Sequence, residues 1–362
     1  MQTIRAAVCH EFGAPLSVED VHLAAPVAGE VEVTLAACAI CHSDITYASG
    51  AWGGDLPAVY GHEAAGHVTA LGPGVTGHAI GDRVLVTLIR ACGTCPACAT
   101  ARPSICMAGD SAAPLTTTDG TPIFQAMHCG AFAEKVVVDQ SQLAPVPEAI
   151  PLDVASLLSC GVITGVGAVV NAGQVRPGED VVVIGAGGVG LNAIQGAKLA
   201  GARRIVAVDL TAEKLADAAA FGATDGVLAT DPKPWAAMRE KTGKLADAVF
   251  VTVGATKIYD TAPRYLAPGG RLVMVGMPPS GEMASYAPDI IASLGQRLIG
   301  TKMGDTVLSR DIPWLSDLYL QGRLELDSLI SNRWRLDQIN DAIADTKSGA
   351  ARRNVILFDS PA

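Results

Sequence analysis

The pattern of hydrophobic and polar positions changes character near residue 160. Before that point, short runs rich in Val and Thr are bounded by Gly, Pro or Asp, which is typical of strands joined by turns. The clearest of these runs cover residues 31–40, 67–72, 81–89 and 133–139. This part of the chain therefore predicts a loop-rich, mainly β unit of antiparallel strands.

From about residue 165 to 300, short apolar runs alternate with longer amphipathic segments. Strands are expected at 179–187, 203–209, 248–254 and 271–277, and helices at 189–202 and 212–223. This alternation predicts a parallel, doubly wound sheet, so the expected fold class is α/β: a Rossmann sheet plus the mainly β unit. After about 300, two helical segments and a last strand are expected at 311–324, 336–349 and 354–358.

Composition limits the classes of function. The chain has 362 residues, of which 49% are apolar and 17% charged, so about two domains and a large core are expected. Its net charge of −10 argues against a nucleic-acid partner. The most apolar run, 181–194, is broken by glycines and falls short of the roughly 20 apolar residues of a membrane span. The N-terminus also lacks the apolar core of a signal peptide, so we expect a cytoplasmic protein without a membrane partner.

A glycine motif indicates a dinucleotide site. Gly185-Ala186-Gly187-Gly188-Val189-Gly190 follows an apolar strand and opens a helix, which is the context this motif requires. Asp209 lies 19 residues beyond Gly190, where its carboxylate can accept hydrogen bonds from the ribose hydroxyls of NAD and would repel the 2′-phosphate of NADP. Leu210 follows it, rather than an Arg. The alternative is a plain tight turn, and the motif does not specify a reaction.

Four clustered cysteines indicate a structural zinc site. Cys92, Cys95, Cys98 and Cys106 follow C-x2-C-x2-C-x7-C spacing, and four thiolates can close a tetrahedral zinc site. An iron–sulfur run would have a last gap of three followed by Pro, whereas here the gap is seven and Met107 follows. Free core cysteines are the other alternative, but these lie in a Gly-, Thr-, Pro- and Ala-rich loop.

A second, dispersed set has the composition of a catalytic zinc site. Cys41, His62 and Cys160 would leave the fourth zinc position open for water or substrate. They are 21 and 98 residues apart, so each alone could equally be a core residue. Cys38-x2-Cys41 lacks a thioredoxin-like surrounding, and His62-Glu63-x3-His67 is one residue too long for the helical metalloprotease motif.

Together these residues resemble the zinc-dependent medium-chain alcohol dehydrogenase family, over essentially the whole chain. The resemblance rests on 41–44 (CHSD), 61–66 (GHEAAG), the four-cysteine loop, Cys160-Gly161 and the glycine motif with Asp209. Zinc-free relatives such as quinone reductases lack both cysteine sets. The resemblance implies a discontinuous GroES-like catalytic domain over 1–162 and 302–362, with an NAD-binding domain over 163–301. It also implies two Zn²⁺ ions per chain, NAD and a homodimer.

The resemblance also implies roles for individual residues. Cys41, His62 and Cys160 would hold the catalytic zinc, Asp44 would orient His62, and Glu63 would lie near the metal unless it is merely solvated. Ser43 would take the proton of the alcohol. The implied cofactor contacts are His42 and Arg353 at the pyrophosphate, Thr164 at the nicotinamide, Lys214 near the adenosine ribose unless it is a solvated helix residue, and Val275 and Met277.

The sequence departs from the family at positions that bear on the substrate. Relatives with a full proton relay have a His where this chain has Thr46, so the relay would end at Thr46, water or another group. Glutathione-dependent relatives carry acidic residues where this chain has 51–55 (AWGGD), and an Arg where it has 107–110 (MAGD). Residues 118–121 and 130–132 resemble bacterial mycothiol-dependent formaldehyde dehydrogenases and related alcohol dehydrogenases.

We therefore expect reversible alcohol oxidation with NAD. Oxidation of an S-(hydroxymethyl)thiol, formed from mycothiol or glutathione, is the alternative. A zinc- and NAD-binding regulatory protein without turnover would be expected to lack a catalytic ligand or Ser43, and none is lost. Trp52 and Met127 are expected to shape the substrate pocket, and His128 and Cys129 are either near that pocket or structural.

Overall fold

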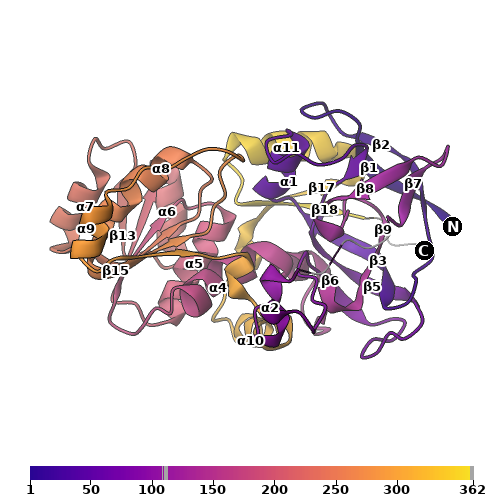
Figure 1. The fold of residues 1–362 in the computed structure, drawn as a ribbon, viewed down its shortest axis with the longest axis horizontal. Coiled ribbons are helices and arrows are strands. Elements are labelled where there is room, and N and C mark those ends of the chain that lie inside the picture. The colour runs from indigo at the N-terminus through magenta and orange to yellow at the C-terminus, as the bar shows by residue number, and fades with distance from the viewer. Residues whose placement is uncertain (108, 110–112, 359–362) are drawn as a thin grey trace. The chain divides into compact units, whose positions relative to one another are not determined.

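The computed structural model describes residues 1–107, 109 and 113–358, and the chain forms two compact units (Figure 1). Unit 1 comprises Met1–Cys160 and Val307–Ala362, and unit 2 comprises Gly161–Thr306. Residues 108 and 110 of the 107–110 segment considered above lie outside the described residues.

Unit 1 is built on a small barrel and a larger sheet. The barrel has the strand order β1 (Gln2–Cys9), β2 (Ser17–Leu23), β7 (Leu115–Thr117), β8 (Pro122–Gln125), β4 (Ala58–Val59). The sheet has the order β10 (Leu143–Pro145), β6 (Arg83–Val86), β5 (Glu63–Leu71), β3 (Glu30–Ala39), β18 (Arg353–Leu357), β17 (Ile330–Arg335), and β9 (Lys135–Asp139) also pairs with β3. Most of its strand pairs are antiparallel, as expected, but β17 and β18 run parallel.

The strands of unit 1 explain two sequence motifs, His62-Glu63-x3-His67 and residues 118–121. The segment after His62 is strand β5, which excludes the helical metalloprotease motif. Residues 118–121 form the turn between β7 and β8, where the Asp119 carboxylate accepts hydrogen bonds from the Thr117 hydroxyl and from the backbone N–H of Thr121 (3.2 Å). An Asp that bonds the backbone two residues on is ordinary turn chemistry.

The helices of unit 1 are short. They are α1 (His42–Ala48), α2 (Pro96–Ala99), α3 (Leu152–Leu157), α10 (Leu308–Leu320) and α11 (Ile339–Ser348). Of these, α3, α10 and α11 contact strands of the sheet. The buried side-chain amide of Asn354 on β18 donates hydrogen bonds to the Ala342 carbonyl (3.2 Å) and the Thr346 hydroxyl (2.9 Å) of α11. This contact fixes the strand that also carries Arg353.

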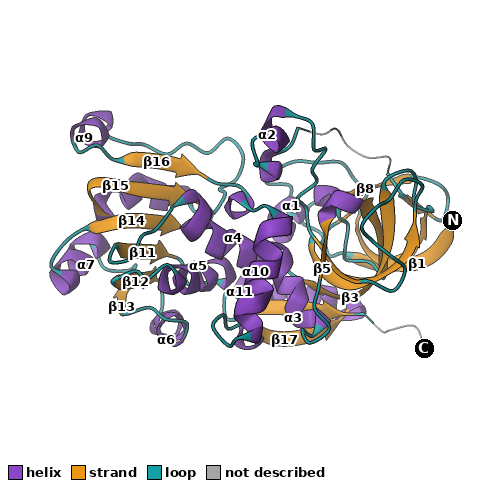
Figure 2. Ribbon diagram, turned by 90° about the horizontal axis from the view of Figure 1, so that it is seen from below, coloured by secondary structure: helices purple, strands orange, loops and turns teal. Residues whose placement is uncertain are grey.

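Unit 2 is a doubly wound α/β unit, which confirms the expected fold class (Figure 2). Six parallel strands are arranged in the order β13 (Asp225–Leu228), β12 (Arg204–Asp209), β11 (Asp180–Ile184), β14 (Ala246–Val251), β15 (Leu266–Met274), β16 (Arg297–Gly300). In sequence order this is 3-2-1-4-5-6, whose direction reverses between β11 and β14. Its helices are α4 (Ile163–Gly167), α5 (Gly188–Leu199), α6 (Ala212–Ala220), α7 (Pro234–Thr242), α8 (Thr256–Thr261) and α9 (Pro288–Ser293).

Among the described residues, the helical segment Leu152–Ala172 is long and apolar enough to be compared with a membrane span. It has 21 residues and a mean hydropathy of 1.8, which is enough by length and composition alone to cross a membrane. However, 89% of its most apolar stretch is buried inside the protein, as in a core helix. Two π-helical turns, Leu158–Val162 and Ala168–Ala172, interrupt its α-helical pattern.

Candidate zinc and cofactor sites

The dispersed Cys/His set comes together in unit 1. One ligand atom from each of Cys41, His62, Glu63 and Cys160 lies within 4.8 Å of the others, and all four residues are buried. Cys41 ends the segment after β3 and caps α1, whereas His62 and Glu63 stand at the start of β5. Cys160 sits in the π-helical turn Leu158–Val162, a kind of irregularity that is frequent at functional sites.

Asp44 organises this cluster from the first turn of α1. Its Oδ1 accepts hydrogen bonds from the backbone N–H of Gly61 (2.9 Å) and from Nδ1 of His62 (2.9 Å). Its Oδ2 accepts from the backbone N–H of Cys41 (3.0 Å). Asp44 is 1% exposed, so one buried carboxylate fixes the positions of two of the candidate ligands. This is the contact expected of a residue that orients a metal-binding imidazole.

The His62 ring is set up to offer a lone pair to a metal ion. Because Nδ1 donates to Asp44, we assign the tautomer in which Nε2 is unprotonated. This Nε2 is fully buried and has no hydrogen-bond partner among the described residues. An unpaired buried polar atom is costly. A zinc ion bound by this nitrogen and by the thiolates of Cys41 and Cys160 would satisfy it, so the residues fit the metal.

The electrostatics of the cluster also fit a cation. A hydrogen bond from the Cys160 thiol lowers the pKa of Cys41 well below its ordinary value. Burial opposes a charged imidazolium, but the Asp44 carboxylate outweighs it and raises the pKa of His62. When Cys41, Cys160, Asp44 and Glu63 are ionised and His62 is neutral, as a metal ligand must be, four negative charges face the one positive charge of Arg353, and a divalent cation offsets two of them.

Glu63 is fully buried, so its solvated alternative is wrong. Its Oε1 lies 3.1 Å from Nη1 of Arg353, and Nη1 also donates to the Ile40 carbonyl (3.3 Å). Burial raises the pKa of Glu63 to about 7, although the charge of Arg353 opposes the shift. Arg353 is itself 5% exposed, and its Nη2 has no partner among the described residues. Its expected contact with a pyrophosphate stays a prediction.

The first turns of α1 carry the remaining expected catalytic residues. Ser43 follows Cys41 by two residues, is half-buried, and makes no hydrogen bond through its hydroxyl within the described part of the chain. His42 is exposed. The Thr46 hydroxyl donates to the backbone carbonyl of His42 (2.8 Å), so its proton is already engaged within the helix. Of the two hydroxyls expected in the proton relay, Ser43 and Thr46, Ser43 is therefore the one that is available to a substrate.

Two hydrogen bonds that the sequence did not indicate hold the helical turn that contains Cys160 in place. The Ser159 hydroxyl donates to the Ala64 carbonyl (3.0 Å), and the Thr87 hydroxyl donates to the Ser159 carbonyl (2.6 Å). Both bonds tie the turn that carries Cys160 to β5 and the end of β6. By contrast, Cys129 is fully buried and lies 3.6 Å from the Gln142 amide, which favours its structural alternative.

The four-cysteine loop has the geometry of a closed metal site. The four Sγ atoms lie within 4.8 Å of one another, and Sγ of Cys95 is 3.8 Å from Sγ of Cys106. Tetrahedral zinc with Zn–S bonds of about 2.3 Å would place its sulfurs about 3.8 Å apart. Backbone N–H groups of Thr94 and Cys95 lower the pKa of Cys92 to about 6, which favours the thiolate. These residues also fit zinc.

We expect Cys95→Ser to remove one zinc per chain and to lower the melting temperature. The free energy of binding a structural metal contributes directly to folding, so the loop should open when a ligand is lost. Zinc content by elemental analysis, melting curves and limited proteolysis within residues 92–106 would measure the effect. Ala99→Ser, an exposed change in the same loop, is the control. Unchanged zinc content in Cys95→Ser would contradict a structural zinc here.

The glycine motif forms the turn between β11 and α5 in unit 2. Gly185 has φ +100°, and a Cβ on Gly190 would lie 1.7 Å from the Gly185 carbonyl oxygen, so both positions require glycine. A Cβ on Gly187 would meet nothing within 4 Å, which leaves open space beside the backbone for a ligand. Asp209 at the end of β12 accepts hydrogen bonds from the backbone N–H groups of Ala186 (2.6 Å) and Leu210 (2.6 Å).

The remaining expected cofactor residues are spread over unit 2. Thr164 is nearly buried, and its hydroxyl lies 3.7 Å from Sδ of Met303. Val275 is half-buried, with its backbone N–H bonded to Val251 (3.0 Å), whereas Met277 is 57% exposed. Lys214 is half-buried on α6. Their shared role in holding a cofactor stays a prediction.

Comparisons with known proteins cover both units. Residues 27–148 match the alcohol dehydrogenase GroES-like domain family, and residues 188–321 match the zinc-binding dehydrogenase family. The chain is 35% identical over 376 residues to the S-(hydroxymethyl)glutathione dehydrogenase of Paracoccus denitrificans, which covers 98% of this chain and 99% of that protein. It is 34% identical over 367 residues to the NDMA-dependent alcohol dehydrogenase of Amycolatopsis methanolica, with 98% and 99% covered.

The same similarity extends to solved structures. The crystal structure of benzyl alcohol dehydrogenase from Acinetobacter calcoaceticus matches with a TM-score of 0.92 at 29% identity, and the match covers 99% of this chain and 100% of that chain.

Proposed function

Because the chain belongs to the zinc-dependent medium-chain alcohol dehydrogenase family, we propose that it oxidises an alcohol to an aldehyde or ketone with NAD, reversibly. The observation that carries this proposal is the buried, unpartnered Nε2 of His62 beside the thiols of Cys41 and Cys160. These three residues would hold the catalytic zinc. Cys92, Cys95, Cys98 and Cys106 would hold a second, structural zinc.

Zinc, when bound, supplies Lewis acidity that lowers the pKa of an alcohol hydroxyl and polarises a carbonyl. The chain supplies the positioning. Asp44 holds the His62 ring and the Cys41 backbone, and Ser43 Oγ, which is otherwise unbonded, would take the proton of the alcohol. Because the Thr46 hydroxyl proton is engaged with His42, the proton would leave Ser43 through water or by rearrangement of that bond. Glu63 and Arg353 would balance charge beside the metal.

Unit 2 would bind the dinucleotide. The open side of Gly187 and the N-terminus of α5 would receive the pyrophosphate, and Asp209 would receive the ribose hydroxyls. A carboxylate at that position disfavours the additional phosphate of NADP, which supports NAD. We accordingly assign unit 1 as the catalytic domain and unit 2 as the NAD domain.

The substrate is proposed to be a free alcohol. Relatives named for a glutathione adduct and for alcohols are equally similar to this chain, so overall identity does not separate them. The local sequence favours a free alcohol, because glutathione-dependent relatives carry acidic residues at 51–55 and an Arg at 107–110. This chain has a single acidic residue at 51–55, Asp55, and Met107 follows the fourth cysteine. An S-(hydroxymethyl)thiol substrate remains the second candidate, since residues 118–121 and 130–132 resemble mycothiol-dependent formaldehyde dehydrogenases as well as related alcohol dehydrogenases.

The test is NADH formation by the purified, zinc-loaded protein. Primary alcohols, including a benzylic one, should be oxidised without any thiol. Formaldehyde with glutathione or with mycothiol forms the second arm. Turnover of free alcohols supports the proposal, whereas turnover only of a thiol adduct would replace it with the second candidate. If the protein oxidised neither the free alcohols nor the thiol adducts with NAD or with NADP, both candidate functions would be contradicted.

A homodimer is the proposed assembly, and β16 and α9 would form its interface. β16 has a neighbouring strand on one side, β15, and α9 buries none of its residues. Met283 is 86% and Ile290 50% exposed, which is unusual for large apolar side chains. A twofold axis would let this edge and these residues cover one another. Light scattering should give a dimer that Ile290→Asp weakens and Val27→Asp, an exposed apolar site in unit 1, leaves intact.

We propose a cytoplasmic location on the same chemistry. None of the nine cysteines is joined in a disulfide, and zinc–thiolate sites such as the four-cysteine loop persist in a reducing compartment.

A further inference from the structure

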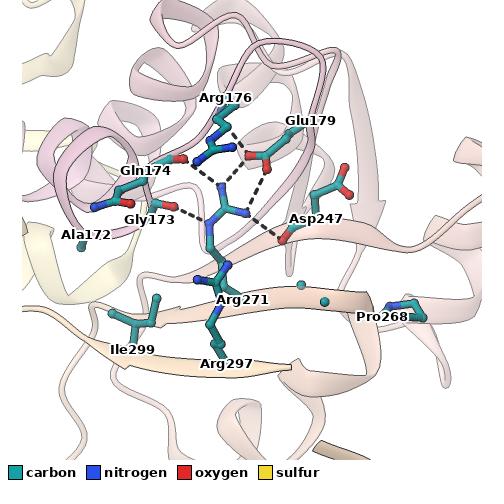
Figure 3. A pocket seen from close by; sticks show the side chains of 12 residues that line it. Ala172, Gly173, Gln174, Arg176, Glu179, Asp247, Pro268, Arg271, Arg297 and Ile299 are labelled. Carbon is teal, nitrogen blue, oxygen red and sulfur yellow. Dashed lines mark hydrogen bonds and ion pairs between the residues drawn. The ribbon is translucent and has the colours of Figure 1, made fainter. Parts of the chain in front are cut away.

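A polar cavity of about 440 Å³ lies in unit 2 at the edge of the sheet where the strands begin (Figure 3). Glu179 directly precedes β11, Asp247 is the second residue of β14, and Arg297 is the first residue of β16. The glycine motif follows the other end of β11. Because the strands are parallel, the cavity and the dinucleotide loop lie at opposite edges of the sheet.

Arg271 in the centre of the cavity has no donor left for a ligand. Its Nε donates to the Gly173 carbonyl, and Nη1 donates to Glu179 (3.1 Å) and to the Asp247 carbonyl (3.3 Å). Its Nη2 donates to Glu179 (2.5 Å) and to the Gln174 carbonyl (3.3 Å). A guanidinium has five N–H groups, and five bonds engage this one. Arg271 is therefore a structural clamp, and it neutralises Glu179.

The second carboxylate of the cavity is also neutralised. Asp247 Oδ2 lies 3.2 Å from the ammonium group of Lys244 and accepts the backbone N–H of Asp180 (2.8 Å). Two further guanidinium groups, of Arg176 and Arg297, line the cavity and are exposed. Neither side chain makes a hydrogen bond or ion pair within the described residues, and Figure 3 shows them on either side of the Arg271 guanidinium.

The charge of the cavity thus contrasts with that of the chain. The protein carries a net charge of −10, yet this cavity combines neutralised carboxylates with two unpaired guanidinium groups. Guanidinium groups bind carboxylates and phosphates through paired N–H donors. The volume lies within the roughly 300–1,000 Å³ that is usual for small-molecule sites, so it exceeds what a bare phosphate ion needs.

We propose that this cavity binds a small organic dianion between Arg176 and Arg297. A phosphate monoester and a dicarboxylate share the required chemistry, with two negative charges on a compact polar body. The site is separate from the dinucleotide loop, so its ligand would bind together with the cofactor. It goes beyond the proposed dehydrogenase activity and does not depend on it.

Calorimetric titration at low ionic strength tests the proposal, with glycerol phosphate in one arm and succinate in the other. The zinc-loaded protein is first saturated with NADH, so that the anion site of the glycine motif is filled. We expect one binding event per chain in at least one arm. The double variant Arg176→Gln/Arg297→Gln should bind that anion about 10- to 100-fold more weakly. Both residues are exposed, so the variant should keep its melting temperature. Arg297 begins β16, the strand placed at the proposed dimer interface, but an edge strand pairs through its backbone groups. The variant should therefore also keep the oligomeric state of the unchanged protein, as measured by light scattering.

Arg239→Gln is the matched control, because Arg239 is an exposed, unpaired arginine on α7 outside the cavity. It should bind the anion as the unchanged protein does. Stronger binding of glycerol phosphate would assign the ligand as a phosphate monoester, and stronger binding of succinate as a dicarboxylate. The proposal is overturned if neither anion binds saturably at millimolar concentrations, or if the double variant binds as tightly as the control.

Discussion

Cys160→Ala is expected to lose the catalytic zinc and nearly all turnover while keeping its fold and its affinity for NADH. Cys160 contributes one of the two thiols beside Nε2 of His62, and a three-ligand site that loses a thiolate binds zinc weakly. Zinc contributes several kcal/mol of charge stabilisation in the transition state, so kcat/KM should fall by about 10³-fold or more. NADH titration by fluorescence should be unaffected, because the glycine motif lies in unit 2.

The matched control for this variant is Cys9→Ala. Cys9 is a fully buried cysteine outside both metal clusters, and its thiol donates to the Glu11 carbonyl (3.3 Å). It should retain two zinc ions per chain and normal turnover, which separates loss of a ligand from loss of a buried cysteine. Full activity or an unchanged zinc content in Cys160→Ala would refute the catalytic assignment of this residue.

The sequence predicts best what depends on neighbouring residues. The glycine motif and the four-cysteine loop are local, so their spacing alone indicates their geometry, and the structure has both as turns of the expected kind. The parallel sheet was likewise predictable, because β11, β12 and β14 are buried apolar runs. In contrast, β13 and β16 have four residues each, several of them partly exposed, so no strand pattern signals them.

The zinc cluster of unit 1 depends on contacts between distant segments, which periodicity does not reveal. The residue types of Cys41, His62 and Cys160 suggest a catalytic zinc site, but their spacing is weak evidence, and the resemblance to a family strengthens the grouping. The π-helical turn that presents Cys160 has no sequence signature. The burial of Glu63 against Arg353 joins β5 to β18, nearly 300 positions apart, so the sequence alone left a solvated Glu63 open as an alternative. The supporting bonds of Ser159 and Thr87 are similarly nonlocal.

Asp209→Gly is expected to shift cofactor preference from NAD toward NADP. Loss of the carboxylate removes hydrogen bonds to the ribose and the repulsion of a 2′-phosphate. A hydrogen bond to a charged group contributes about 1.5–3 kcal/mol, so the ratio of kcat/KM for NAD to that for NADP should fall by about 10- to 100-fold. Asp209 also holds the Ala186 backbone (2.6 Å), so both cofactors should lose affinity and the ratio is the informative quantity.

Two further variants distinguish the effect of the negative charge of Asp209 from the effect of its hydrogen bonds to the backbone of the glycine motif. Asp209→Asn keeps an acceptor oxygen for the backbone N–H groups but has no charge, so it should shift the ratio in the same direction with a smaller loss of NAD affinity. Asp231→Asn is the matched control, because Asp231 is exposed and also accepts a backbone N–H, from Lys233 (2.8 Å), but makes no hydrogen bond to the glycine motif within the described part of the chain. If the ratio were unchanged in both Asp209 variants, the carboxylate would serve only to hold the turn at Ala186. In that case the preference for NAD would have to come from residues other than Asp209.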